Sequence, residues 1–127
     1  MFTTIHCLWI LTQIIPALQN TKHLWKMQLR KIKNVRWKVV VFHHSVYSTA
    51  SHTTDGDIIQ RRNELPPVFD ELGIDVVLMG HDHVYTRTHV MKGQEVVTDT
   101  TNLKSVTDPD GIVYLTANSA SGSKYYD

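Results

Sequence analysis

The sequence predicts an α/β protein, and the order of its apolar segments carries this prediction. Two runs of mainly β-branched and large apolar residues, at residues 39–42 and 74–79, are typical of buried strands in a parallel sheet. A segment with helical periodicity lies before each run, at residues 20–33 and 57–72. The resulting strand, helix, strand order is the unit from which parallel sheets are built.

The first strand is expected within residues 4–11, where most residues are apolar. A secretory signal is an alternative identity for residues 5–18, but the run lacks the basic start of such signals, and we favour a core strand. Gln13, Pro16 and Gln19 interrupt the run. No segment therefore reaches the roughly 18 apolar residues that a membrane span needs.

Charge is distributed unevenly along the chain. Residues 1–54 carry seven basic residues and no acidic one, a net charge of +7, whereas the remainder carries 12 acidic and 6 basic residues, a net charge of −6. One interpretation is that residues 22–38 bind nucleic acid or another anionic surface. We favour a solvated helix face, because Trp25, Leu29 and Ile32 fall at helical spacing opposite the lysines.

The second helix is expected over residues 57–72, and Gly73 is expected to end it. Pro66 and Pro67 oppose a continuous helix, because a proline inside a helix removes a hydrogen bond and clashes with the preceding turn. We therefore expect the helix to restart with proline in its first turn. Further strands are expected at residues 84–90, 94–97 and 111–117.

Length and cysteine content set outer limits on the architecture. The 127 residues are 42% hydrophobic, which fits a single globular domain spanning residues 1–127. The single Cys7 excludes a disulfide within the chain and every zinc pattern built from several cysteines.

The most informative residues are histidines at the ends of the two apolar runs. His43 follows the first run, and His81 and His83 follow the second after Gly80. Ligands of α/β sheets bind at the carboxyl ends of strands, and Gly80 allows the backbone to turn sharply there. Imidazole is a good ligand for transition metals. The placement predicts a metal site, and the alternative is that His81 and His83 are surface imidazoles in a loop.

Residues 37–87 resemble the carboxyl half of the calcineurin-like metallophosphoesterases, and within them the purple acid phosphatase branch. The motifs are the strand ending in His43 followed by Tyr47-Ser48, the helix sequence Arg61–Leu65 with Phe69–Asp75, and the loop Gly80–Arg87. A later segment at residues 111–115 is also similar, so the resemblance covers roughly residues 37–120. It implies the carboxyl half of a four-layer α/β/β/α sandwich, whose strand-end loops hold two metal ions and hydrolyse phosphate esters.

The resemblance also implies roles for individual histidines. The positions of His43 and His81 bind one metal ion in that family, and the position of His83 binds the other; iron, zinc and manganese all suit such ligands. His52 stands five residues after Tyr47 and resembles the histidine that holds substrate and assists the leaving group. The alternative is that His52 is an exposed loop residue without a role.

Four further residues are expected to support the site or to contact substrate: His44, Tyr47, Asp82 and Arg87. His44 directly follows His43, so in a strand-like continuation its side chain would face the opposite way. One interpretation is that Arg87 binds the phosphate of the substrate, but we favour its pairing with Asp82, Asp75 or a backbone carbonyl.

Acidic ligands that the family carries before its histidine motifs are absent from this sequence, because no acidic residue precedes Asp55. We therefore expect the chain to be the carboxyl portion of a longer enzyme, with little activity of its own. It is expected to hold at most one metal ion, weakly, through some of His43, His81 and His83. Its expected partners are a phosphate ester and either the missing amino-terminal half or another chain.

The competing hypothesis is a noncatalytic binding module in which the basic segment at residues 22–38 contacts an anionic partner, with nucleic acid disfavoured. The sequence determines neither the substrate nor the compartment, although the branch it resembles is often exported.

Overall fold

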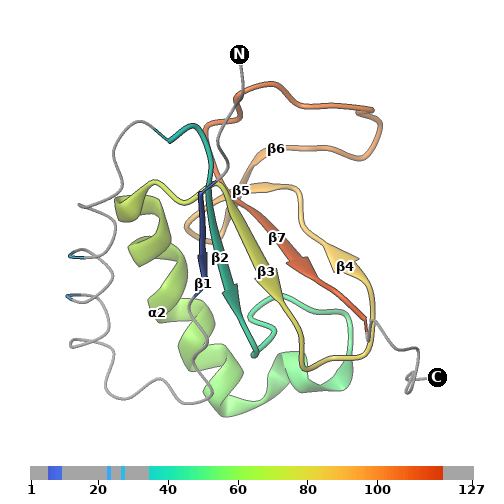
Figure 1. Ribbon diagram of the computed structural model, residues 1–127. Helices are drawn as coiled ribbons and strands as arrows, with labels where there is room; N and C mark the ends of the chain where they lie inside the picture. Colours follow the sequence, from blue (N-terminus) through green and yellow to red (C-terminus); the bar gives the residue numbers. More distant parts are fainter. Residues whose placement is uncertain (1–5, 10–22, 24–26, 28–34, 119–127) are drawn as a thin grey trace.

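The computed structural model describes residues 6–9, 23, 27 and 35–118, and its centre is a five-stranded sheet of strand order β1-β2-β3-β7-β4 (Figure 1). The strands are β1 (His6–Trp9), β2 (Lys38–Phe42), β3 (Val76–Met79), β7 (Val113–Thr116) and β4 (Thr86–Arg87). The first four run parallel, and β4 is antiparallel to β7. The α/β class predicted from the sequence is therefore confirmed.

One face of the sheet packs against helix α2 (Gly56–Leu72), which lies along the sheet in Figure 1. Alternate residues of a strand point to the same face, and those of β2 and β3 on this face are Val40, Phe42, Val77 and Met79, all at most 5% exposed. From α2, Leu65 and Phe69 are fully buried in the same cluster. The rings of Phe42 and Phe69 lie 6.1 Å apart between centroids.

Helix α2 runs without interruption through Pro66 and Pro67, so the predicted restart at the prolines is wrong. A proline inside a helix costs about 3 kcal/mol or more. Leu65 and Phe69, on either side, are both fully buried, and each large apolar side chain gains about 1.5–3 kcal/mol on burial. Packing of the helix on the sheet therefore offsets much of the cost of the two prolines.

Helix α2 ends at Leu72, directly before Gly73, as the sequence predicted. Gly73 adopts a left-handed conformation with φ of 63°, and its N–H donates to the carbonyl of Asp70. The N–H of Ile74 donates to the carbonyl of Phe69. These bonds satisfy carbonyls that the helix end would leave without partners, which is the usual function of a glycine at this position.

Beyond β3 the chain forms a second, two-stranded sheet of β5 (Val90–Lys92) and β6 (Glu95–Thr98). The strand predicted at residues 84–90 is therefore divided into β4 and the start of β5. The division falls at Thr88, whose side-chain oxygen accepts the N–H of Tyr114 at 3.1 Å. The Thr88 side chain thus takes the place of a backbone carbonyl as the acceptor for β7, and the regular pairing of β4 with β7 ends there.

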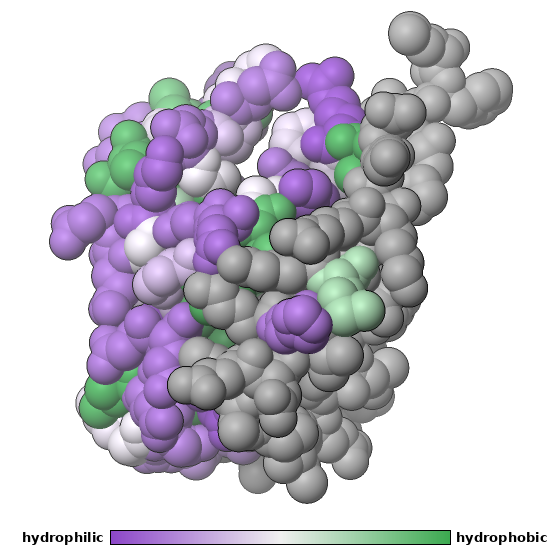
Figure 2. Space-filling model, turned by 90° about the vertical axis from the view of Figure 1, so that its left-hand side faces the viewer, coloured by the Kyte–Doolittle hydropathy of each residue, from purple (hydrophilic) through white to green (hydrophobic). Residues whose placement is uncertain are grey.

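The helix predicted at residues 20–33 lies outside the described residues except for His23 and Met27, which are helical and exposed. The hypothesis that residues 22–38 bind an anionic partner therefore stays a prediction. Within the described part of the chain, no helix has the length and apolar character required to cross a membrane. In Figure 2, the coloured surface of one face is mainly hydrophilic, with small, separate hydrophobic spots.

Candidate functional site

The predicted site residues gather where the chain leaves β2 and β3. These strands are parallel neighbours, and their last residues, Phe42 and Met79, are paired. Their carboxyl ends therefore meet at one edge of the sheet, at the bottom of Figure 1. The loop after β2 contains the short 3-10 helix η1 (Ser51–Thr54), and the loop after β3 begins at Gly80.

Hydrogen bonds between backbone and side chain hold the two loops together. The N–H of Gly80 donates to the carbonyl of His43 at 3.0 Å. The hydroxyl of Ser45, which is 1% exposed, donates to the carbonyl of Gly80 and accepts the N–H of Asp82 at 3.4 Å. Both loops are thus fixed relative to each other, and so are the imidazoles that they carry.

The sharp turn after β3 falls on His81 and not on Gly80. The φ angle of His81 is 67°, in the left-handed region that residues other than glycine seldom adopt. Strained residues of this kind persist where the surrounding structure holds them, and they are frequent at functional sites. Gly80 has space for a side chain, because a Cβ there would lie 3.6 Å from the carbonyl oxygen of His43, an ordinary van der Waals distance.

The imidazoles of His43 and His81 are in direct contact. Nε2 of His43 lies 3.1 Å from Nδ1 of His81, and the ring planes are inclined by 83°. Two nitrogens bound to one zinc ion, each at about 2.0–2.1 Å, lie roughly 3 Å apart, so the observed separation fits two ligands of one ion. Burial lowers the pKa of His43, and His81 and His83 lower it further, which favours the neutral form that binds metals.

His52, on η1, lies on the other side of His81. Its ring centroid is 4.9 Å from that of His81, and its Nδ1 is 2.8 Å from a carboxylate oxygen of Asp55. The hydrogen bond to Asp55 raises the pKa of His52, and the charge of Asp82 adds to this effect. His52 therefore has defined contacts inside the cluster and is not an isolated loop side chain.

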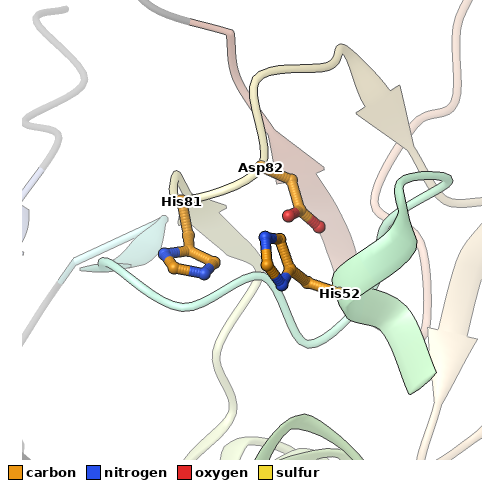
Figure 3. Close-up of side chains that lie close together, drawn as sticks. All are labelled: His52, His81 and Asp82. Carbon is orange, nitrogen blue, oxygen red and sulfur yellow. The ribbon is translucent and has the colours of Figure 1, made fainter. Parts of the chain in front are cut away.

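Asp82 is the most deeply buried polar group of the cluster. It is 1% exposed, and neither carboxylate oxygen accepts a hydrogen bond. Figure 3 shows its carboxylate beside the ring of His52, with His81 next to both. In the described part of the chain, His52, His81 and Asp82 form the one group of three possible ligands whose donor atoms all lie within 4.8 Å of one another.

The predicted set of His43, His81 and His83 is gathered only in part. The first two are in contact, whereas His83 is half-buried and joins no such group of three among the described residues. His83 does act on His43 electrostatically. Its assignment to a second metal ion stays a prediction.

Arg62 of α2 fixes the loop that carries His52, and the sequence did not reveal this role. Its Nε donates to the carbonyl of Val46 at 2.6 Å, and its terminal nitrogen donates to the carbonyl and hydroxyl oxygens of Thr53 at 2.7 and 2.9 Å. The guanidinium also lies 5.7 Å from the ring centroid of Tyr47. One cation thus holds both ends of the loop.

His44 and Tyr47 have positions that the sequence did not predict. The ring of His44 stacks near that of His81, with centroids 5.7 Å apart and planes at 28°, so the predicted opposite orientation is wrong. Strand β2 ends at Phe42, and strand alternation therefore does not extend to His44. Tyr47 packs on Tyr114 with centroids 4.7 Å apart and donates its hydroxyl to the carbonyl of Gly93, which are contacts within the fold.

Arg87 is exposed on β4 and forms no ion pair with Asp75 or Asp82 in the described structure, so these two expected pairs are wrong. Its expected alternative partner, a backbone carbonyl, stays a prediction. Asp75 is already engaged, because its carboxylate accepts the N–H of Lys38 at 2.6 Å. Contact of Arg87 with phosphate stays a prediction.

Comparison with known proteins finds a matching family model and similar relatives. The family model described as calcineurin-like phosphoesterase matches residues 4–85. Purple acid phosphatase 18 of Arabidopsis thaliana is 34% identical over 101 residues, or 76% of the chain, and purple acid phosphatase 17 is 42% identical over 53 residues, or 42% of the chain. An uncharacterized protein of Mycobacterium tuberculosis is 36% identical over 64 residues, or 50% of the chain.

The chain spans only a small part of these relatives. The matched segments take up 20% of purple acid phosphatase 18, 15% of purple acid phosphatase 17 and 12% of the mycobacterial protein.

Proposed function

Since the chain belongs to the calcineurin-like phosphoesterase family, we propose that it supplies the histidine side of a metal-dependent phosphoric ester hydrolase. The observation that carries the proposal is the contact between His43 and His81, whose ring nitrogens lie 3.1 Å apart although the residues are 38 positions apart in sequence. Both come from loops that follow adjacent parallel strands. In the proposed site they bind one transition metal ion and His83 binds a second.

The chemistry of the donors supports iron, zinc or manganese at these positions. When bound, the ions would supply positive charge that polarises a phosphate ester and lowers the pKa of water. Neutral imidazole is the form that ligates a metal, and the lowered pKa of His43 favours that form.

We assign proton donation to His52. Its pKa is raised by the hydrogen bond to Asp55, so the ring keeps its proton at a higher pH than a free imidazole does. A group of this kind is suited to protonate the leaving oxygen of a phosphate ester. Arg62 serves this role indirectly, because it fixes the loop on which His52 lies.

The second part of the proposal is that residues 1–127 form part of one such domain and do not complete the site alone. No acidic residue precedes Asp55, and the matched segments amount to at most 20% of the relatives named above. The remaining carboxylate ligands would therefore come from a further segment or from another chain. On its own the chain would bind at most one ion, weakly.

A chimera tests the assignment of residues. The segment of purple acid phosphatase 18 that matches this chain is replaced by the corresponding segment of the chain, which at 76% of 127 residues includes His43, His81 and His89. Hydrolysis of a chromogenic phosphate monoester is then measured. We expect the chimera to retain metal-dependent turnover. Loss of one metal ligand should reduce that turnover by a factor of about 10–100 or more, because even residues that only orient a ligand have effects of this size. The variants are His43→Ala and His81→Ala, and the control is His89→Ala, at a distant half-exposed position.

The isolated chain is assayed in parallel with manganese, zinc and iron. We expect no turnover above background. Turnover that is lost in His81→Ala would contradict the claim that the site needs ligands from elsewhere. A folded chimera whose activity is unaffected by His81→Ala would contradict the proposed function itself.

A further inference from the structure

We propose that this chain binds one divalent transition metal ion through His52, His81 and Asp82. This set differs from the set of His43, His81 and His83 that the family resemblance implies. It does not depend on whether the chain hydrolyses any substrate. Asp82 is the one residue of the three whose burial is nearly complete.

Asp82 carries a carboxylate that the described fold leaves without a hydrogen bond. The residue is 1% exposed, and both of its oxygens lack a hydrogen-bond partner. A buried carboxylate of this kind is costly unless it is paired or coordinates a metal ion. Its backbone N–H, by contrast, is held by the carbonyl of Gly80 at 2.8 Å. The backbone at Asp82 is therefore held in place, and the carboxylate lies beside the ring of His52 (Figure 3).

The contact between His52 and Asp55 orients the ring for ligation, although an ion must compete with the ring proton that the same contact helps to retain. A metal-binding histidine commonly donates its second ring N–H to a carboxylate, which fixes the tautomer and the ring orientation. Nδ1 of His52 lies 2.8 Å from Asp55, so a proton on Nδ1 would make Nε2 the ring nitrogen that ligates the ion. Asp55, which is exposed, would act as the outer partner of this ligand.

The spacing of the three side chains requires little adjustment. Their donor atoms lie within 4.8 Å of one another, whereas the ligand atoms of one zinc ion are roughly 3 Å apart. Side-chain rotations that move each donor atom by about 1 Å would therefore bring all three within reach of one ion. Two imidazoles and one carboxylate, with further positions for water, are a donor set that zinc accepts.

The position of the ion has a consequence for His52. An ion bound here takes the lone pair of the ring that the proposed hydrolysis uses as a proton donor. Occupation of this site would therefore inhibit hydrolysis in a complete enzyme. The site also shares His81 with the His43 pair, so we expect one ion and not two in this chain.

The experiment measures zinc affinity of the purified chain by competition with a chromogenic chelator at neutral pH. We expect one equivalent of zinc and a loss of affinity of at least about tenfold in both Asp82→Asn and His52→Ala, since even residues that orient a ligand have effects of this size. The matched control is Asp99→Asn, because Asp99 also lies near a histidine, at 3.4 Å from His89, but is exposed. It should leave the affinity unchanged.

Circular dichroism in the presence of a chelator checks that each variant is folded. If Asp82→Asn does not fold, His52→Ala still tests the site, because His52 is half-exposed and its substitution disturbs the core less. Absence of zinc binding in the wild-type chain would overturn the inference. So would affinity that is lost in His43→Ala but kept in Asp82→Asn, and this result would leave the proposed function intact. An inactive chimera together with Asp82-dependent zinc binding would instead overturn the function and support the inference.

Discussion

Two aspartates flank the same strand, β3, and differ completely in what their carboxylates contact. At the amino end, Asp75 accepts the N–H of Lys38 at 2.6 Å, and its own N–H donates to the carbonyl of Lys38 at 3.0 Å. At the carboxyl end, Asp82 is more deeply buried, yet both of its side-chain oxygens lack a hydrogen bond. Only the first carboxylate strengthens the pairing of β2 with β3.

The difference separates a structural end of the sheet from a functional one. At the amino end the polar groups satisfy one another, and Lys38 also donates its side-chain N–H to the carbonyl of Leu72 at 2.9 Å. At the carboxyl end the histidines and Asp82 form an arrangement that stability alone does not favour. Departures from local consistency of this kind are expected at functional sites.

The largest effect is expected at the structural end, for Asp75→Ala. The substitution leaves the N–H of Lys38 without its acceptor, and loss of one partner of a partly buried hydrogen bond costs about 1–3 kcal/mol. We expect the free energy of unfolding in urea, measured with a chelator present, to fall by about 2 kcal/mol. In the control Asp110→Ala, an exposed ion pair with Lys92 is lost, and the change should stay below about 0.5 kcal/mol. Equal losses in the two variants would remove the special role of Asp75.

A smaller effect of opposite sign is expected for Asp82→Asn. In the absence of metal, the substitution removes a buried charge that has no hydrogen bond and keeps the shape of the side chain. We expect the free energy of unfolding to rise by about 1 kcal/mol in chelator, because an unpaired buried charge is destabilising. Added zinc should then stabilise the wild-type chain more than the variant. Destabilisation of the kind expected for Asp75→Ala would show that both ends of β3 are structural.

Much of the fold could be predicted because its signals are local. The apolar runs at residues 39–42 and 74–79 identified β2 and β3 to within two residues, and Gly73 marked the end of α2. The contact between His43 and His81 also followed from local information, because carboxyl ends of neighbouring parallel strands share one edge of a sheet.

The remaining features depend on contacts between distant segments, which periodicity does not encode. Continuity of α2 through Pro66 reflects packing on the sheet, and the role of Arg62 arises from a loop that returns to the helix. The burial of Asp82 depends on the contact between the loops after β2 and β3, which Ser45 joins by hydrogen bonds. The orientation of His44 depends on where β2 ends, because strand alternation does not extend to a residue two positions beyond Phe42.

The smallest expected effect is a pH dependence that belongs to the carboxyl end alone. Burial lowers the pKa of His43 and His44 below 6.5, and neighbouring positive charges add to this. Between the folded and unfolded pKa values the unfolded chain binds more protons, so stability is complete above about pH 6.5 and falls as the pH decreases below it. His52 has the opposite sign, because its raised pKa gives stability that is present below 6.5 and lost as the pH rises through the folded value.

The free energy of unfolding in chelator, measured against pH, separates these contributions. His44→Gln should weaken the loss of stability on acidification below about pH 6.5, whereas His52→Ala should remove the decline in stability as the pH rises above 6.5. Asp110→Ala, at an exposed site away from the cluster, should leave the profile unchanged. Titration of the histidines by nuclear magnetic resonance provides the direct measurement. A pKa above 6.5 for both His43 and His44 would mean that their rings are more hydrated than their contacts with His81 imply. The pH dependence of stability would then not arise from these two histidines at the carboxyl end of the sheet.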